Sequence, residues 1–325
     1  MSDIAELLGI SCATVSRALN DSPKISEETK RRVLEAAKKT GYLEKFEAKR
    51  QQTVKKIGFI ISKHYFGTNE PFYTKVLLGA EELANKENMR VNLFTINEQD
   101  TVDWLLMDLK EFKIDEVIVA AAISSKTIKR LITAGLKIVL VDFEHGQLPT
   151  VEPDNLNGAY AAVRHLQSRG REKIAFISGE KDHPSMLQRY RGYRLAIEEA
   201  GGQYNEDLIL QTSGYCTVEE GYQQGLRLLR KGDFDAVLAG NDAMAVGVIR
   251  AFTEKGLQIP RDVSVVGFDD VEMGLYTSPP LTTVRIHKEK MGQIAASMLV
   301  HWQLDWGKIG WRVLVPTELV VRESS

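Results

Sequence analysis

Apolar residues recur three and four positions apart along the first 20 residues, and a glycine interrupts them. The first predicted helix has Ser2 or Asp3 as its cap and ends at Gly9, whose tolerance of left-handed backbone permits a tight turn. A second helix is predicted over about Cys12–Leu19, with Ser11 as its cap. Neither helix carries enough apolar surface to belong to a large core.

A third helix is predicted from Ser26, with two glutamates in its first turn, to Gly41, which ends it. The first helix has apolar positions at helical spacing in Ile4, Ala5, Leu7 and Leu8. The positions expected to face inward in the other two helices are Val15, Leu19, Val33, Leu34 and Ala37. Three short helices within the first 43 residues, the first two joined by a glycine turn, predict a helix-turn-helix unit.

The hydrophobic pattern changes from residue 56 onward. Short runs rich in Val and Ile alternate with amphipathic segments of about 10 to 15 residues, as in parallel βα units. The runs are KIGFII, RVNLFTI, DEVIVAA, KIVLVDF, KIAFISG, AVLAG and VSVVGFDD. The body is therefore predicted to be α/β and doubly wound.

Polar residues stand directly at the ends of several of these predicted strands. Asp142 ends IVLVD, Asn241 and Asp242 follow AVLAG, and Asp269 and Asp270 follow VSVVGF. Open α/β sheets bind ligands beyond the carboxyl ends of their strands. We expect Asp242 and Asp270 to cap the helices that follow, and we expect Asp142, Asn241 and Asp269 to reach a shared cleft and bond ligand hydroxyls.

Motifs for catalysis or cofactor binding are absent from the sequence. No GxGxxG follows the first strand, no GxxxxGK[ST] occurs, and neither a Ser-His-acid set nor a paired-carboxylate signature is visible. The two cysteines, Cys12 and Cys216, suggest neither a disulfide framework nor a zinc site. There is no apolar run of about 18 residues and no secretory pattern at the N-terminus. We expect a cytoplasmic protein of two or three domains, without catalytic residues, cofactor, metal or membrane partner.

Charge divides the chain into two parts. Residues 1–56 hold 12 Lys and Arg against 8 Asp and Glu, whereas the remainder holds 30 against 36. A basic head on an acidic body favours a polyanion as the partner of the head, although a solvated charged module explains the charge equally well.

The N-terminal stretch DIAELLGISCATVSRALND resembles the motif D-I-A-x-x-x-G-[VI]-S-x-x-T-V-S-R-x-L-N of the lactose/galactose repressor (LacI/GalR) family. The match covers the whole motif without a gap. A chance pair of helices would match its spacing but not its identities. The resemblance implies that the second helix lies in the major groove of double-stranded DNA.

The resemblance also implies roles for single residues. Cys12 and Ala13 match the variable base-reading positions, and Arg17 matches a base-contacting arginine, which can bond O6 and N7 of guanine. Short polar side chains suited to the backbone of DNA stand at Ser11, Thr14, Ser16, Asn20, Ser26 and Thr29. Helix capping or solvation is the alternative for each hydroxyl, a surface ion pair for Arg17 and a redox role for Cys12.

The predicted linker, residues 44–55, departs from the family pattern. The family inserts a leucine into the minor groove from a hinge helix that Pro-Asn introduces and that ends in A-R-x-L. Here Pro-Asn is missing and Gln51 stands at the place of the leucine, although Ala48 and Lys49 fit the two positions before it. Wedging into the minor groove normally uses an apolar side chain, and Phe46 is the only large one in the segment. The sequence leaves two alternatives for this segment, a solvated basic tether and an ordered hinge.

The body carries a second resemblance to the same family. NDAMAVGVIRAFTEKGLQIPRDVSVVGFDD and PPLTTVRIHKEKMG look like its C-terminal signatures, so the body is expected to resemble periplasmic sugar-binding proteins. The motifs assign effector binding to Asn241, Asp269 and Arg189, and more loosely to Asp142. Phe72 and Tyr73 are candidates to stack on the effector, with core packing as the alternative, and Tyr215 and Cys216 lie near another contact position.

The family pattern also implies two lobes, between which the chain crosses three times. Lobe 1 is expected to hold about residues 56–157 and 286–315, and lobe 2 about 158–285 and 316–325. An effector would then bind between the lobes.

Together the head and the body predict a sequence-specific, ligand-controlled transcriptional regulator. We expect a repressor of carbohydrate genes that binds a pseudo-palindromic operator as a homodimer, with a sugar-type effector. A faint resemblance to galactoside-responsive members leaves the effector unidentified. A solute-binding protein would need export, and an enzyme would need a visible catalytic site, so both alternatives fit the sequence less well.

Overall fold

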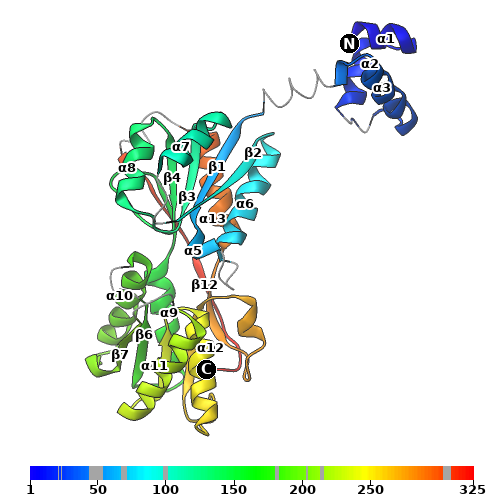
Figure 1. The fold of residues 1–325 in the computed structure, drawn as a ribbon. Helices are drawn as coiled ribbons and strands as arrows, with labels where there is room; N and C mark the ends of the chain where they lie inside the picture. Colours follow the sequence, from blue (N-terminus) through cyan, green and yellow to red (C-terminus); the bar gives the residue numbers. More distant parts are fainter. Residues whose placement is uncertain are drawn as a thin grey trace. The chain divides into compact units, whose positions relative to one another are not determined.

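The computed structural model describes residues 1–20, 22, 24–43, 54–66, 72–97, 102–179, 183–202, 204–212, 216–302 and 309–325. The chain divides into two compact units, Met1–Lys55 and Lys56–Ser325, which we call the head and the body (Figure 1). Most of the predicted linker, including Phe46, Ala48, Lys49 and Gln51, lies outside the described residues.

The head consists of helices α1 (Ser2–Leu8), α2 (Cys12–Leu19) and α3 (Glu27–Lys39). Gly9 ends α1 in the left-handed conformation, with φ of 64°, as the sequence predicted. Ile4, Val15 and Val33 are fully buried and join the three helices in one small core.

One predicted inward position of the head, Leu34, is wrong, since its side chain is 42% exposed. Leu7, one of the apolar positions of the first helix, is 63% exposed. The helix α3 contacts both α1 and α2 through Val33, Ala36 and Ala37, so its buried stripe is narrow and Leu34 falls beside it.

Lobe 1 of the body is a six-stranded, fully parallel sheet in the order β11-β5-β4-β3-β1-β2. Its strands are β1 (Lys56–Ser62), β2 (Arg90–Ile96), β3 (Glu116–Ala120), β4 (Lys137–Val141), β5 (Thr150–Pro153) and β11 (Arg312–Val315). The helices are α5 (Lys63–Phe66), α6 (Phe72–Lys86), α7 (Val102–Glu111), α8 (Ser125–Thr133) and α13 (Lys288–Val300). Helices α6 and α13 pack together because glycines let their backbones touch: a Cβ on Gly292 would lie 1.9 Å from the carbonyl oxygen of Val76.

Lobe 2 is a second six-stranded sheet in the order β12-β10-β9-β8-β6-β7. Its strands are β6 (Ile174–Ser178), β7 (Ile209–Gln211), β8 (Ala236–Ala239), β9 (Ser264–Asp269), β10 (Thr282–Ile286) and β12 (Thr317–Val320). All neighbours are parallel except β10 and β12. The helices are α9 (Asn155–Ser168), α10 (Pro184–Glu199), α11 (Val218–Lys231) and α12 (Asp242–Glu254), with 3₁₀ turns η1 (Glu206–Leu208) and η2 (Glu272–Leu275).

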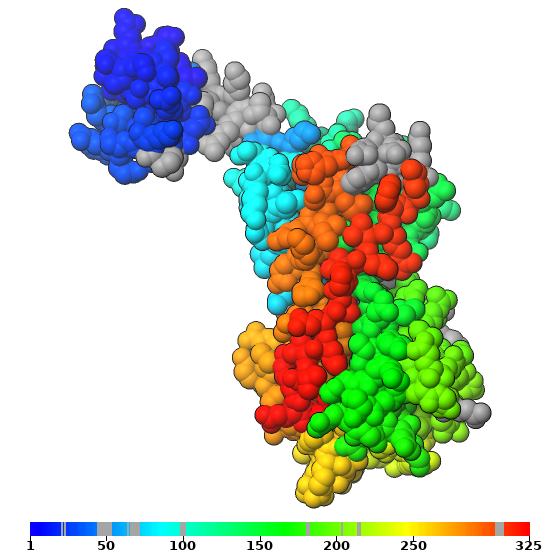
Figure 2. All heavy atoms as spheres, turned by 180° about the vertical axis from the view of Figure 1, so that it is seen from behind, coloured from blue at the N-terminus to red at the C-terminus, as the bar shows by residue number. Residues whose placement is uncertain are grey.

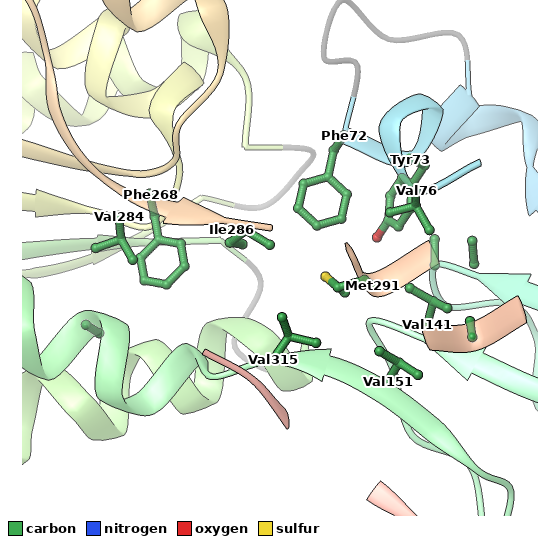
Figure 3. Packing of buried hydrophobic residues seen from close by; sticks show 14 of the residues in the cluster. Phe72, Tyr73, Val76, Val141, Val151, Phe268, Val284, Ile286, Met291 and Val315 are labelled. Atoms are coloured by element: carbon green, nitrogen blue, oxygen red, sulfur yellow. The ribbon is translucent and has the colours of Figure 1, made fainter. Parts of the chain in front are cut away.

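The chain passes between the lobes at three places. These are the steps from β5 to α9, from β10 to α13, and from β11 to β12. Figure 2 shows the last of them, where the C-terminal segment, in red, runs over both lobes. The hydrophobic core also continues across the junction, since one cluster contains Phe72 and Met291 of lobe 1 and Phe268 and Ile286 of lobe 2 (Figure 3).

Candidate DNA-binding head and effector site

The second helix of the head presents the residues that the sequence assigned to DNA. Cys12, Ala13 and Arg17 on α2, and Asn20 directly after it, are exposed, whereas Val15, on the opposite side of the helix, is fully buried. Because the buried side holds α2 against α1 and α3, the exposed side is held in a fixed orientation and is free to contact a partner.

Hydroxyl pairs begin the second and third helices. The Ser11 hydroxyl accepts a hydrogen bond from the Thr14 amide at 3.1 Å, and the two side-chain oxygens lie 2.9 Å apart. Ser26 and Thr29 repeat this arrangement at the start of α3, at 3.3 and 2.9 Å. Ser11 and Ser26 therefore cap helices, the alternative that the sequence left open for them, and the Thr14 and Thr29 hydroxyls each bond the capping serine.

In the body, Asp142 joins the two lobes. It follows β4 of lobe 1 and adopts φ of 66°, which turns the chain sharply at the end of the strand. The Tyr73 hydroxyl, on α6 of the same lobe, donates to one carboxylate oxygen at 2.8 Å. The Ser185 hydroxyl, on α10 of lobe 2, donates to the other at 2.9 Å. Burial and the neighbouring Asp142 carboxylate raise the pKa of Tyr73 well above its usual value, so its hydroxyl stays protonated.

Arg189 and Asp269 form a buried ion pair in lobe 2. A guanidinium nitrogen of Arg189 lies 3.3 Å from the Asp269 carboxylate, its Nε donates to Asn155 at 2.8 Å, and a third nitrogen donates to the Gly240 carbonyl. The guanidinium also lies 3.8 Å from the ring centroid of Phe268. Burial raises the pKa of Asp269, although the nearby cations Arg189 and Lys288 oppose that rise.

Capping at the end of β8 belongs to a different residue from the one that the sequence predicted. Asn241, not Asp242, is the cap of α12, since its side-chain oxygen accepts from the Met244 amide at 2.9 Å. The Asn241 amide nitrogen donates to the Cys216 carbonyl at 3.0 Å. Asp242 is instead fully buried and accepts from the Thr283 hydroxyl and the Val271 amide.

The prediction that Asp270 caps a helix is also wrong. Val271 occupies the cap position of η2, and Asp270 accepts from Arg285 at 2.7 Å and from Arg322 at 2.6 Å. Burial raises the pKa of Asp270, but the hydrogen bonds from Arg322 and Arg285 outweigh this effect and lower it. Asp270 therefore links β9, β10 and the segment after β12 rather than starting a helix.

Lys288 is a residue of the junction that sequence reasoning missed. It begins α13, is 2% exposed, donates to the Asp269 carbonyl and lies 5.6 Å from the ring centroid of Phe72. Burial lowers the pKa of Lys288. The motif PPLTTVRIHKEKMG contains this lysine, but the sequence did not predict a role for its side chain.

The structure therefore brings most of the predicted effector residues to one place. Tyr73 and Ser185 bond Asp142, and Arg189 and Lys288 bond Asp269. Helix α10 carries both Ser185 and Arg189 and so relates the two groups. The ring centroids of Phe72 and Tyr73 lie 4.9 Å apart, and both rings belong to the buried core, the alternative that the sequence left open for them. Stacking of either ring on an effector stays a prediction. Asn241 directly follows Gly240, whose carbonyl accepts from Arg189, but its own side chain bonds Cys216 and Met244. Tyr215 lies outside the described residues.

Within the described part of the chain, no group of His, Cys, Asp and Glu is arranged to hold a metal ion. The described helices include none with the length and apolar character needed to span a membrane.

Comparison with known proteins relates both parts of the chain to one group. Residues 1–44 match the family of bacterial regulatory proteins, lacI family, and residues 163–325 match the periplasmic binding protein-like domain. The HTH-type transcriptional repressor PurR of Histophilus somni (strain 129Pt) is 30% identical over 99% of this chain and 97% of its own length. The HTH-type transcriptional regulator RegA of Clostridium saccharobutylicum is 34% identical over 92% and 90%.

Solved structures give the same result for the fold. The transcriptional regulator CelR in complex with cellobiose superposes with a TM-score of 0.75 at 29% identity, covering 99% of this chain and 98% of that one. The lac repressor dimer bound to operator and the anti-inducer ONPF has a TM-score of 0.76 at 24% identity, covering 99% and 97%. Since these similarities run through head and body together, the chain belongs to the lacI family of bacterial regulatory proteins, which are ligand-controlled, DNA-binding regulators of transcription rather than enzymes.

Proposed function

We propose that this chain is a repressor of carbohydrate genes whose effector is a sugar bound between the two lobes. The observation that carries this proposal is the contact of Asp142 with both Tyr73 and Ser185, because a ligand that bonds Asp142 acts on both lobes at once. The carbohydrate class and the named effector residues are the parts of the proposal that experiment has to test.

The chemistry of the junction suits a polyhydroxylated ligand. The carboxylates of Asp142 and Asp269 accept hydrogen bonds, and the guanidinium of Arg189 and the amide of Asn241 donate them. The buried ring of Phe72 adds an apolar group beside these polar side chains, which suits the C–H groups of a sugar ring. The relative CelR was solved with cellobiose, which supports a sugar for this chain.

The head is proposed to read double-stranded operator DNA through α2. Arg17 would bond a guanine, and Cys12 and Ala13 would meet base edges, while Ser16 and Asn20 would contact the backbone along the same exposed side. One small head offers too little contact for operator specificity, so we propose a homodimer on a pseudo-palindromic site in the cytoplasm.

Binding at the junction is proposed to change the angle between the lobes and with it the spacing of the two heads. A coupling of about 1 to 3 kcal/mol between the two sites corresponds to a change of roughly 5- to 150-fold in operator affinity. Such a coupling is sufficient for control of transcription.

A thermal-shift screen of the full chain against mono- and disaccharides and phosphorylated sugars tests the effector. A ligand at 100 times its dissociation constant adds about 2.7 kcal/mol to the free energy of unfolding. We expect one sugar to stabilise the wild type and the control Asp233→Asn, which changes an exposed carboxylate, but not Asp269→Asn. If nucleosides bind at the junction and sugars do not, the carbohydrate part of the proposal fails while the DNA-binding head stands.

A further inference from the structure

Lobe 2 contains a pocket that is lined by residues other than those of the junction between the lobes. Its volume is about 370 Å³, and it lies between α10 and α11 beside β7, the last strand of the sheet. All of its lining residues belong to lobe 2, and none of them is among the proposed effector residues. This volume falls within the range of small-molecule sites.

Among the lining residues, Gln224 has a buried side-chain acceptor that no described residue bonds. Gln224, on α11, is 7% exposed, and its amide nitrogen donates to the Gln211 carbonyl at 3.2 Å. Its side-chain oxygen is buried and accepts no hydrogen bond from the described residues. Because a buried carbonyl oxygen without a partner costs free energy, this position favours a ligand that donates a hydrogen bond.

The rest of the lining indicates the charge and polarity of such a ligand. Met186 and Tyr190, on α10, form an apolar wall. The exposed side chains Glu206 and Arg227 bring one negative and one positive charge, and neither makes an ion pair with the described residues. The opposite charges balance, so the pocket favours neither an anion nor a cation.

We propose that this pocket is a second ligand site, for an uncharged, polyhydroxylated ring compound such as a pyranose. One hydroxyl of the ligand donates to the Gln224 oxygen, and others donate to Glu206 and accept from Arg227. The C–H face of the ring lies against Met186 and Tyr190. The site is independent of the junction in its contacts, but its regulatory effect rests on the function proposed above.

Helix α10 connects the two sites. Met186 and Tyr190 line the pocket, whereas Ser185 and Arg189, on the same helix, make the hydrogen bonds to Asp142 and Asp269. A ligand that shifts or fixes α10 therefore changes the geometry of the junction. We expect occupancy of the pocket to change effector affinity by about 5- to 150-fold, the usual range for coupled sites.

Ligand-detected NMR by saturation transfer on the full chain tests this proposal, with methyl β-glucopyranoside, galactose and cellobiose as probes and glucose 6-phosphate as the charged comparison. Gln224→Met keeps the length and burial of the side chain and removes the acceptor. Leu187→Trp fills the pocket from a half-buried position and serves as a second variant if the first does not fold. Asp269→Asn disables the junction instead.

We expect a neutral probe to bind the wild type and Asp269→Asn, with affinity at least about tenfold weaker when Gln224→Met or Leu187→Trp is combined with Asp269→Asn. Binding that Asp269→Asn abolishes and that both pocket variants retain would place the sugar only at the junction, and would overturn the second site while supporting the function proposed above. Binding of glucose 6-phosphate at the pocket, or of none of the neutral probes to Asp269→Asn, would overturn the proposed ligand class.

Discussion

The hydroxyl of Tyr73 and the carboxylate of Asp142 are joined by a buried hydrogen bond of 2.8 Å, and Ser185 of the other lobe binds the same carboxylate. This carboxylate stands at the end of a strand, in a left-handed backbone conformation that few non-glycine residues adopt. Its position is therefore fixed by the sheet on one side and by two hydroxyl donors on the other.

Tyr73→Phe removes one of these donors and leaves the Asp142 oxygen without it. Since a hydrogen bond to a charged group contributes about 1.5 to 3 kcal/mol, we expect the free energy of unfolding to fall by about that amount in urea titrations. The control is Tyr160→Phe, whose hydroxyl bonds Glu199 on the surface, and its loss should be clearly smaller. Equal losses in the two variants would contradict the importance of the buried pair.

Arg17→Ala should weaken binding to the preferred operator sequence by about 1 to 3 kcal/mol, because the arginine is proposed to bond a guanine. Fluorescence anisotropy with selected and scrambled DNA duplexes measures this loss. Arg31→Ala is the matched control, since it removes the same charge from an exposed position on α3. The assignment of Arg17 fails if both variants lose affinity equally for the two duplexes.

Ser26→Ala should destabilise the head, because this hydroxyl caps α3. The expected cost is about 0.5 to 2 kcal/mol, observed as a loss of helical signal from the head at lower temperature. Thr40→Ala provides a comparison, since its hydroxyl bonds carbonyls at the other end of the same helix. Unchanged helix melting in Ser26→Ala would show that water replaces the cap.

Asp270→Asn should change the acid stability of the body. The hydrogen bonds from Arg322 and Arg285 overcome the effect of burial and hold the pKa of Asp270 below its usual value. The folded state therefore binds this proton less readily than the unfolded state, so the stabilisation is present above about pH 4 and is lost as pH falls further.

Urea unfolding between pH 7 and pH 3 measures this dependence. The wild type should lose more stability on acidification than Asp270→Asn, whereas Asp103→Asn, at an exposed position, should follow the wild type. Parallel pH profiles for the wild type and Asp270→Asn would show that the ion pairs with Arg285 and Arg322 contribute no net stability.

The sequence predicted helices most accurately where the spacing of the apolar residues and a capping residue indicate the same start. The helix α2 has the predicted bounds, and its cap, Ser11, is the predicted residue, because a serine directly before an apolar helical pattern has few other uses. The α/β class followed equally from the Val- and Ile-rich runs. Leu34 was placed wrongly because periodicity gives the direction of a side chain, but not the width of the surface that covers it.

Details of the junction depended on contacts between segments that are distant in the chain. A strand-end pair such as Asn241 and Asp242 has two candidate caps one residue apart, and only the three-dimensional turn decides between them. Lys288 begins a helix in a charged segment and looks solvated in the sequence. It is buried because the crossing from β10 to α13 brings it close to Phe72 and Asp269.

The three crossings between the lobes also determine the order in which the body can be completed during synthesis. Lobe 1 lacks α13 until the chain has been made to residue 300 and lacks β11 until residue 315, although the first five strands of its sheet lie before residue 154. The sheet of lobe 2 receives β12 only after that. Neither lobe can reach its final form while the ribosome still holds the C-terminal segment, so the two lobes mature almost together, well after the head has left the exit tunnel.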